Sequence, residues 1–400
     1  MSKKKIAVTV SLICAVLLII SAAVVYYFCG TATENGYKFK IFTGEIVKYT
    51  GNEENLSVPS HILGKEVKRI GSYAFYGTKI KTAKISNSVL SVGEGAFSHC
   101  KNLKSVKIGK NAARIGDYAF FKSGIESISF GESVSYIGRG AFSGSGIKRI
   151  TVPDSVSSIS EDMFKYCKNL EGIHIKDGVV SIYNNAFYGC VSLERIILPD
   201  SLNYIGPASF AKCSNLKSVK MSENVKKIEC GSLKNSSDGV FSGCKNLEYI
   251  NLPKNLTQIG ERMFYGCKSL KELTLPRNLQ TIGSDAFCLC TSLKELVLPD
   301  GVTTIENNAD SDVSYQGTFA GCISLEFIKI PEGITKIGHK MFYGCISLSE
   351  IVIPKSVVKI EKWAFMDCHM LSSVQLLNSE TQISDHAFDN CKSVAVSRIE

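Results

Sequence analysis

Cysteine is the residue whose number and spacing most strongly suggest chemistry in this chain of 400 residues, which contains fifteen. Eleven of them follow a recurring phenylalanine by three residues: Cys100, Cys167, Cys190, Cys213, Cys244, Cys267, Cys290, Cys322, Cys345, Cys368 and Cys391. If the phenylalanines mark stacked coils, neighbouring members could approach the Cα separation of a disulfide, about 4.4 to 6.8 Å. Thiolates in a row could also bind a metal ion.

Three features of this set favour buried free thiols. Equivalent side chains on parallel coils point the same way, and an odd number cannot pair completely. The units on either side of Cys100 carry Thr78 and Ser123 at the equivalent position, so Cys100 has no partner there. The closest pair, Cys288 and Cys290, has no histidine nearby. We therefore predict a ladder of small buried side chains, with disulfides and metal binding as open alternatives.

The other candidates for catalysis or ligand binding are weak. The six histidines occupy different repeat positions, and the chain contains no zinc-protease, nucleophile-elbow or phosphate-loop motif. Residues 308–312 begin like a calcium-binding loop, but Val313 replaces the required glycine and Phe319 the closing glutamate. We therefore predict a solvated loop there, no enzyme and no cofactor. Because lysines alternate with acidic residues, nucleic acid is not an expected partner.

The elements that must position these residues follow from one repeated unit. Its phenylalanine recurs mostly every 22 or 23 residues, as Phe75, Phe97, Phe120, Phe142, Phe164, Phe187, Phe210, Phe241, Phe264, Phe287, Phe319, Phe342, Phe365 and Phe388. The unit reads I-G-x-x-A/M-F-x-x-C-x-x-L-x-x-I/L/V-x-I/L-P. Its alternating end predicts a short strand, which stops at proline because proline lacks the amide that would continue a ladder.

A unit of this length cannot bury its own apolar side chains, so neighbouring units must stack on it. The sequence therefore predicts a β-rich repeat solenoid of about 14 coils of 22–23 residues. Each coil should contain one short parallel strand plus turns or short helical turns.

The unit resembles the BspA-like class of leucine-rich repeats found in bacterial surface proteins. The resemblance covers about residues 40 to 400, and residues 46–67 also resemble the segment that caps the first coil in that family. It implies a leucine-rich repeat fold and a cell-surface binding or adhesion role. The implied partner is a protein or glycan on a host or neighbouring cell surface.

The predicted strands also indicate where such a partner would bind. Residues on either side of the inward central apolar residue should form an exposed sheet face. Our candidate ligand face comprises seven of them: Arg195, Tyr249, Glu272, Glu295, Phe327, Lys329 and Glu350. Aromatic residues among charges suit protein binding. A secreted structural or spacer array without a specific ligand is the alternative.

Two insertions interrupt the repeat between the isoleucine and the phenylalanine. They occupy about residues 230–238 and 306–315, three coils apart and at the same angular position. Insertions in repeat proteins often map to one working face, so these loops are a second candidate contact surface. Neutral surface loops are the equally common alternative.

The N-terminus indicates the location of the chain. Lys3, Lys4 and Lys5 precede residues 6–28, which carry no charge and are long enough to cross a bilayer. The positive-inside rule then exports the repeats. We predict a retained signal-anchor, with a cleaved signal peptide and a secreted product as the alternative. The expected organisation is residues 1–30 as anchor or signal peptide, 31–69 as capping segment and 70–400 as solenoid, in a monomer.

Overall fold

The computed structural model describes residues 15–21, 30–230, 238–307 and 317–399. Residues 15–21 form a short helix, and the described remainder consists of strands and turns. No helix among the described residues is long and apolar enough to cross a membrane. The predicted membrane span, residues 6–28, falls mostly outside them, so the anchor stays a prediction. The chain divides into two compact units, Met1–Tyr136 and Ile137–Glu400.

The first unit opens with an antiparallel meander that continues into parallel coils. It contains β1 (Thr31–Glu34), β2 (Tyr37–Lys40) and β3 (Glu45–Tyr49), with the small hairpin of β5 (His61–Ile62) and β6 (Lys65–Glu66) further on. β3 then pairs in parallel with β7 (Arg69–Ile70), and β9 (Ser91–Val92) and β11 (Arg114–Ile115) follow. A second parallel sheet contains β4 (Asn55–Ser57), β8 (Thr82–Lys84), β10 (Ser105–Lys107) and β12 (Ser127–Ser129). Strand β13 (Tyr136–Ile137) lies where the two units divide.

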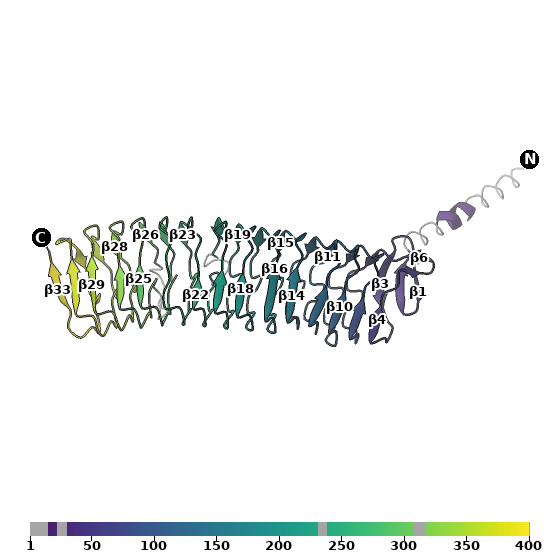
Figure 1. The fold of residues 1–400 in the computed structure, drawn as a ribbon, viewed down its shortest axis with the longest axis horizontal. Coiled ribbons are helices and arrows are strands. Elements are labelled where there is room, and N and C mark those ends of the chain that lie inside the picture. Colours follow the sequence, from purple (N-terminus) through teal and green to yellow (C-terminus); the bar gives the residue numbers. More distant parts are fainter. Residues whose placement is uncertain (1–14, 22–29, 231–237, 308–316, 400) are drawn as a thin grey trace, which may run out of the picture. The chain divides into compact units, whose positions relative to one another are not determined.

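The second unit repeats one coil in which two strands alternate. The strands formed by the Leu-x-x-Ile-x-Leu segment, here called front strands, are β14 (Arg149–Val152), β16 (Gly172–Ile175), β18 (Arg195–Ile197), β20 (Ser218–Lys220), β22 (Tyr249–Ile250), β25 (Glu295–Val297), β27 (Phe327–Lys329), β29 (Glu350–Ile353), β31 (Ser373–Leu376) and β33 (Ala395–Arg398). The back strands are β15 (Ser158–Ile159), β17 (Ser181–Ile182), β19 (Tyr204–Ile205), β21 (Lys227–Ile228), β23 (Gln258–Ile259), β24 (Thr281–Ile282), β26 (Thr304–Ile305), β28 (Lys336–Ile337), β30 (Lys359–Ile360) and β32 (Gln382–Ile383). Figure 1 shows front strands such as β14, β16 and β18 following one another along the unit.

The predicted fold class is confirmed, because the chain is a parallel β-solenoid of about fifteen turns. The structure adds the back strand, which the repeat pattern did not reveal. It is two residues long, as in Ser181–Ile182 paired with Tyr204–Ile205, and therefore too short to show an alternating pattern. The segment around the repeat phenylalanine forms hydrogen-bonded turns, the first of the two predicted options.

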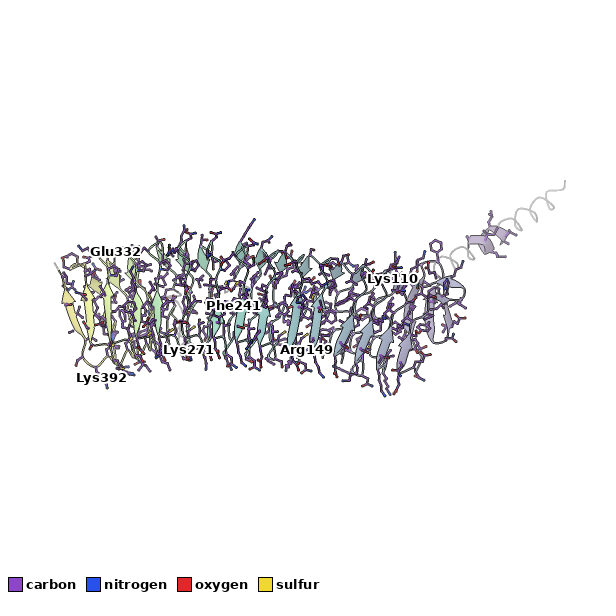
Figure 2. The ribbon with its side chains drawn as sticks, viewed as in Figure 1. Lys110, Arg149, Phe241, Lys271, Glu332 and Lys392 are labelled. Carbon is purple, nitrogen blue, oxygen red and sulfur yellow. The ribbon has the colours of Figure 1, made fainter. Side chains whose placement is uncertain are left out.

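A column of stacked phenylalanines fills the core of each unit. In the second unit the rings of Phe187 and Phe210 lie 5.1 Å apart and those of Phe210 and Phe241 5.5 Å apart, nearly parallel in both pairs. All three side chains are fully buried. Figure 2 shows Phe241 within the stack of coils. The ring contacts join each coil to the next, as expected of a solenoid whose units cannot fold alone.

The turns beside this column also pair from coil to coil. The amide of Phe164 donates to the carbonyl of Ala186 at 2.8 Å, and the amide of Tyr166 donates to the carbonyl of Tyr188 at 2.7 Å. Backbone groups at the turns are therefore satisfied by the neighbouring coil, which gives every coil the same path. This regularity places side chains at equivalent repeat positions in rows along each unit.

Candidate binding surface

The front strands of the second unit present two rows of exposed side chains. Along most of these strands the central apolar residue is buried and the residues on either side point outward, as for Glu295, Leu296 and Val297 in β25. The register aligns Glu295 with Phe327 in one row and Val297 with Lys329 in the other. Figure 2 shows Lys271 at the edge where these strands begin and Glu332 at the edge where they end.

All seven residues of the candidate ligand face are exposed. Six occupy the first row, in the order Arg195, Tyr249, Glu272, Glu295, Phe327 and Glu350, and Lys329 lies in the second. The structure brings Glu295 and Phe327 directly together, whereas Arg195 and Glu350 lie toward opposite ends of the row. These residues form a line of contacts rather than one compact cluster.

Apolar side chains interrupt the charges at several points on this face. Tyr249 is 60% exposed, Phe327 48% and Val297 57%, and Val352 is also exposed, in β29 beside β27. Lys329 ends at the rim of this group, where its ammonium lies 2.9 Å from the carboxylate of Asp300. An ion pair this exposed contributes little stability, so its charges stay available to a partner.

The front strands also line a groove that the sequence did not predict. It has a volume of about 720 Å³ and lies over β16, β18 and β20. His174, Arg195 and Lys220 project from its strands, and Asp177 and Asp200 lie at the strand ends. Of these, only Arg195 was predicted as a ligand residue. The sequence contains one feature that could have indicated this groove. An aspartate follows each of three successive strand segments, at Asp154, Asp177 and Asp200.

The predicted contact loops lie mostly outside the described residues, at 231–237 and 308–316, and so does the calcium-like segment 308–312. The described residues beside them are anchored to the coils. Asp238 accepts a hydrogen bond from the hydroxyl of Tyr188 at 3.1 Å and lies 3.0 Å from the ammonium of Lys212. The amide of Gly317 donates to the buried carboxylate of Asp285 at 2.9 Å.

The cysteines of the ladder are buried as predicted, apart from the half-buried Cys391. Each thiol is placed to donate to the carbonyl of the repeat phenylalanine one coil earlier, as from Cys190 to Phe164 at 3.1 Å. Burial raises the pKa of the Cys167 thiol to about 12 and holds those of Cys190 and Cys267 well above the usual value. These thiols are therefore protonated packing residues rather than nucleophiles. Within the described ranges, no group of three or more histidine, cysteine or acidic side chains is arranged to hold a metal ion.

The shorter repeat units, which lack the ladder cysteine, carry a side chain with a hydroxyl group three residues after the repeat phenylalanine. Ser123 donates to the carbonyl of its own coil's Phe120 at 2.8 Å, whereas cysteine reaches the preceding coil. Thr78 lies beside the one isolated thiol, 3.3 Å from the sulfur of Cys100. The residue at the cysteine position and the length of the repeat unit therefore change together, as expected of a position at which the side chain serves packing.

Comparisons with known proteins agree with this architecture. The sequence model of the BspA type leucine rich repeat region matches residues 53–148, 135–238, 232–317 and 313–399. A search of curated proteins found no match.

Three solved structures share the fold. A leucine-rich repeat protein from Bacteroides ovatus is 24% identical, with 92% of this chain and 97% of that chain covered and a TM-score of 0.59. A leucine rich cell surface protein from Faecalibacterium prausnitzii is 24% identical, with coverages of 92% and 94% and a TM-score of 0.52. The pneumococcal vaccine antigen PcpA is 19% identical, with coverages of 92% and 88% and a TM-score of 0.50. At these identities the likeness shows the fold.

Proposed function

This chain belongs to the BspA-type leucine-rich repeat family, and from that premise we propose that it is an exported surface protein that binds another protein through the front strands of its second unit. The observation that carries the proposal is the set of exposed aromatic and aliphatic side chains in the two rows of an otherwise polar sheet face. Support for the surface location comes from the basic tip and uncharged run at the N-terminus and from the likeness to the Faecalibacterium prausnitzii structure, which is that of a leucine rich cell surface protein.

The geometry of Tyr249 and Phe327 suits binding anchors. Their backbones are held in parallel ladders, Tyr249 beside Ser218 and Phe327 beside Glu295. Each aromatic side chain has only two rotatable torsions, so little conformational entropy is lost when a partner covers it. Aromatic residues that become fully desolvated at an interface carry a large share of its binding free energy.

The charged residues between these anchors would orient the partner. Glu295, Lys329 and Glu350 alternate in sign across β25, β27 and β29. Rim charges in such an arrangement steer association and select against partners of the wrong charge pattern, while adding little affinity. A partner with apolar knobs flanked by both signs of charge fits this face.

The test is the binding of purified, fluorescently labelled full chain to whole cells of the host and of neighbouring bacteria. Replacing Tyr249 and Phe327 together with serine should weaken binding at least thirtyfold, which corresponds to about 2 kcal/mol for one lost anchor. Met370→Ser is the matched control, because Met370 is exposed but lies in a turn outside the front strands. Protease treatment of the cells should abolish binding of the unchanged chain.

Unchanged binding of the Tyr249 and Phe327 variant would remove this face from the function. A chain that binds no cell at all would favour the alternative, a spacer array without a specific ligand. Thermal unfolding of each variant separates loss of binding from loss of fold.

A further inference from the structure

Five aromatic rings form a continuous group at the turns of the first unit, outside its β-strands. We call this group the aromatic strip; it consists of Tyr73, Tyr76, His99, Tyr118 and Phe121. The ring centroids of Tyr73 and Tyr76 lie 6.1 Å apart, those of Tyr76 and His99 5.1 Å, those of His99 and Phe121 5.4 Å and those of Tyr118 and Phe121 5.7 Å. Tyr73 is 49% exposed and Tyr76 53%. His99, Tyr118 and Phe121 are half-buried, so the rings of Tyr73 and Tyr76 form the main solvent-facing part of the strip.

The rings come from positions where neighbouring coils carry glycine or serine. Tyr73 and Tyr118 adopt φ values of 56° and 54°, and the coil between them has Gly95 at φ 56° in the same position. His99, at φ 60°, corresponds to Gly77 at φ 66° one coil earlier. Further along the chain the position of Tyr73 is taken by Asp162 and Asn185 at φ 55° and 54°, so the turn does not require an aromatic residue there.

Tyr73 is held rigidly in place. Its ring lies against Gly95 so closely that a Cβ on Gly95 would come within 2.3 Å of a ring carbon. Its hydroxyl donates to the carboxylate of Glu94 at 2.7 Å. A ring fixed at both ends and exposed on one face is a preformed stacking platform, which lowers the entropy lost on binding.

Polar groups of both kinds surround these ring faces. Glu94 is an exposed acceptor beside Tyr73, and Lys122, whose ammonium lies 4.9 Å from the centre of the Phe121 ring, is an exposed donor. Burial, with Lys101 and Lys122 nearby, lowers the pKa of His99, so its imidazole is neutral at pH 7. The surface therefore offers apolar faces, two acids, Glu94 and Asp117, and dispersed donors without a strong excess of either charge.

We propose that the aromatic strip binds a linear, uncharged glycan. The C–H face of a pyranose ring stacks on an exposed aromatic ring, while its hydroxyls hydrogen-bond to a carboxylate and to amines or imidazole at the ring edges. The rings follow one another along the coils, which are spaced by about 4.8 Å. Because neighbouring rings are tilted or edge-on to one another, a first sugar would stack on Tyr73 or Tyr76, and an extended chain, whose units advance by a similar length, would reach the rings of the next two coils with its following sugars. This surface is separate from the protein-binding face proposed above.

The unit itself supplies the substitutions that test this proposal. Tyr73→Gly reproduces Gly95, and Tyr76→Ser reproduces Ser98, the residue at the equivalent position in the next coil. Glycine accepts the left-handed backbone of position 73 without strain, so the double variant should keep its fold. Tyr136→Ser is the control, because Tyr136 is an exposed tyrosine of the same unit outside the strip.

The probes are cellohexaose, the β-1,4-linked hexamer of N-acetylglucosamine, mannohexaose and polygalacturonate, measured against the full chain by calorimetry. At least one neutral hexamer should bind more tightly than polygalacturonate. The Tyr73→Gly, Tyr76→Ser variant should lower that affinity at least tenfold and Tyr136→Ser should leave it unchanged, with melting temperatures confirming both folds.

Three results would overturn the proposal: no binding of any neutral hexamer, equal binding by the double variant, or displacement of the bound sugar by an excess of a proline-rich decapeptide that binds more tightly. The last result would assign the strip to peptides. None of these results bears on the front strands, because no residue of the strip lies there.

Discussion

Replacing Phe241 with alanine tests whether the phenylalanine column is the main link between coils. Phe241 is fully buried, and its ring centroid lies 5.5 Å from that of Phe210 and 5.9 Å from that of Phe264. Phenylalanine-to-alanine changes in cores cost about 3–5 kcal/mol of unfolding free energy. Because Phe241 contacts a ring on both sides, and each such pair contributes about 0.5–1.5 kcal/mol beyond burial, we expect the upper end of that range.

Two further variants test how much of this loss of unfolding free energy comes from ring stacking. Phe241→Leu keeps an apolar side chain of similar size and should cost about 1.5 kcal/mol. Phe388→Ala changes a half-buried ring whose stacking partner is Phe365, 5.3 Å away, so about 2 kcal/mol is expected. The order of cost should be Phe241→Ala, then Phe388→Ala, then Phe241→Leu.

The assay is urea unfolding of the full chain, followed by far-ultraviolet circular dichroism, with free energies taken from the midpoints and slopes. Each coil contacts only its neighbours, so loss of the Phe241 ring should weaken the coils around position 241 most. A separate transition at lower urea concentration in Phe241→Ala would show that these coils unfold before the rest of the chain. Equal costs for Phe241→Ala and Phe388→Ala, or a cost below about 1 kcal/mol for the former, would refute the reasoning, because a fully buried ring in the column could then be removed without the expected penalty.

Two further predictions concern the thiols and the N-terminus. Iodoacetamide at pH 7.5 should label the buried ladder cysteines of the folded chain slowly, because burial excludes the reagent and, for Cys267, raises the thiol pKa. The half-buried Cys391 should react before Cys267, and peptide mapping checks this order. Ladder cysteines already oxidised in unfolded, unreduced protein would contradict the prediction. Intact-mass measurement on protein from the native host should find the N-terminal run retained, whereas a mature chain beginning between Ala23 and Thr33 would make the protein a released one.

Much of the fold follows from spacing alone. A residue that recurs every 22 or 23 positions returns to the same place on each coil, so the sequence identifies the buried phenylalanine, cysteine and leucine rows. It also identifies the exposed rows, because side chains alternate along a strand. The repeat position of Arg195, Tyr249 and Phe327 is therefore sufficient to place these three residues on one exposed face.

The back strand and the aromatic strip could not be found in this way. A strand of two residues has no period to detect, so Ser181–Ile182 reads as part of a turn. Tyr73, Tyr76 and His99 occupy three different positions of the repeat unit, and spacing gives no reason to group them. The rings of Tyr73 and Tyr76 meet within one turn, and the ring of Tyr76 reaches His99 of the next coil, in directions set by the local backbone.

The groove over β16, β18 and β20 also has one property that the sequence determines and another that depends on the tertiary structure. The sequence by itself determined that His174, Arg195 and Lys220 are exposed, since each lies beside a buried strand residue at a fixed repeat position. Only the tertiary structure decided that their side chains, with Asp177 and Asp200, enclose a hollow of about 720 Å³. Periodicity records whether a side chain points inward or outward, whereas the depth of a surface depends on side-chain length, rotamer and coil stacking, which no interval in the sequence encodes.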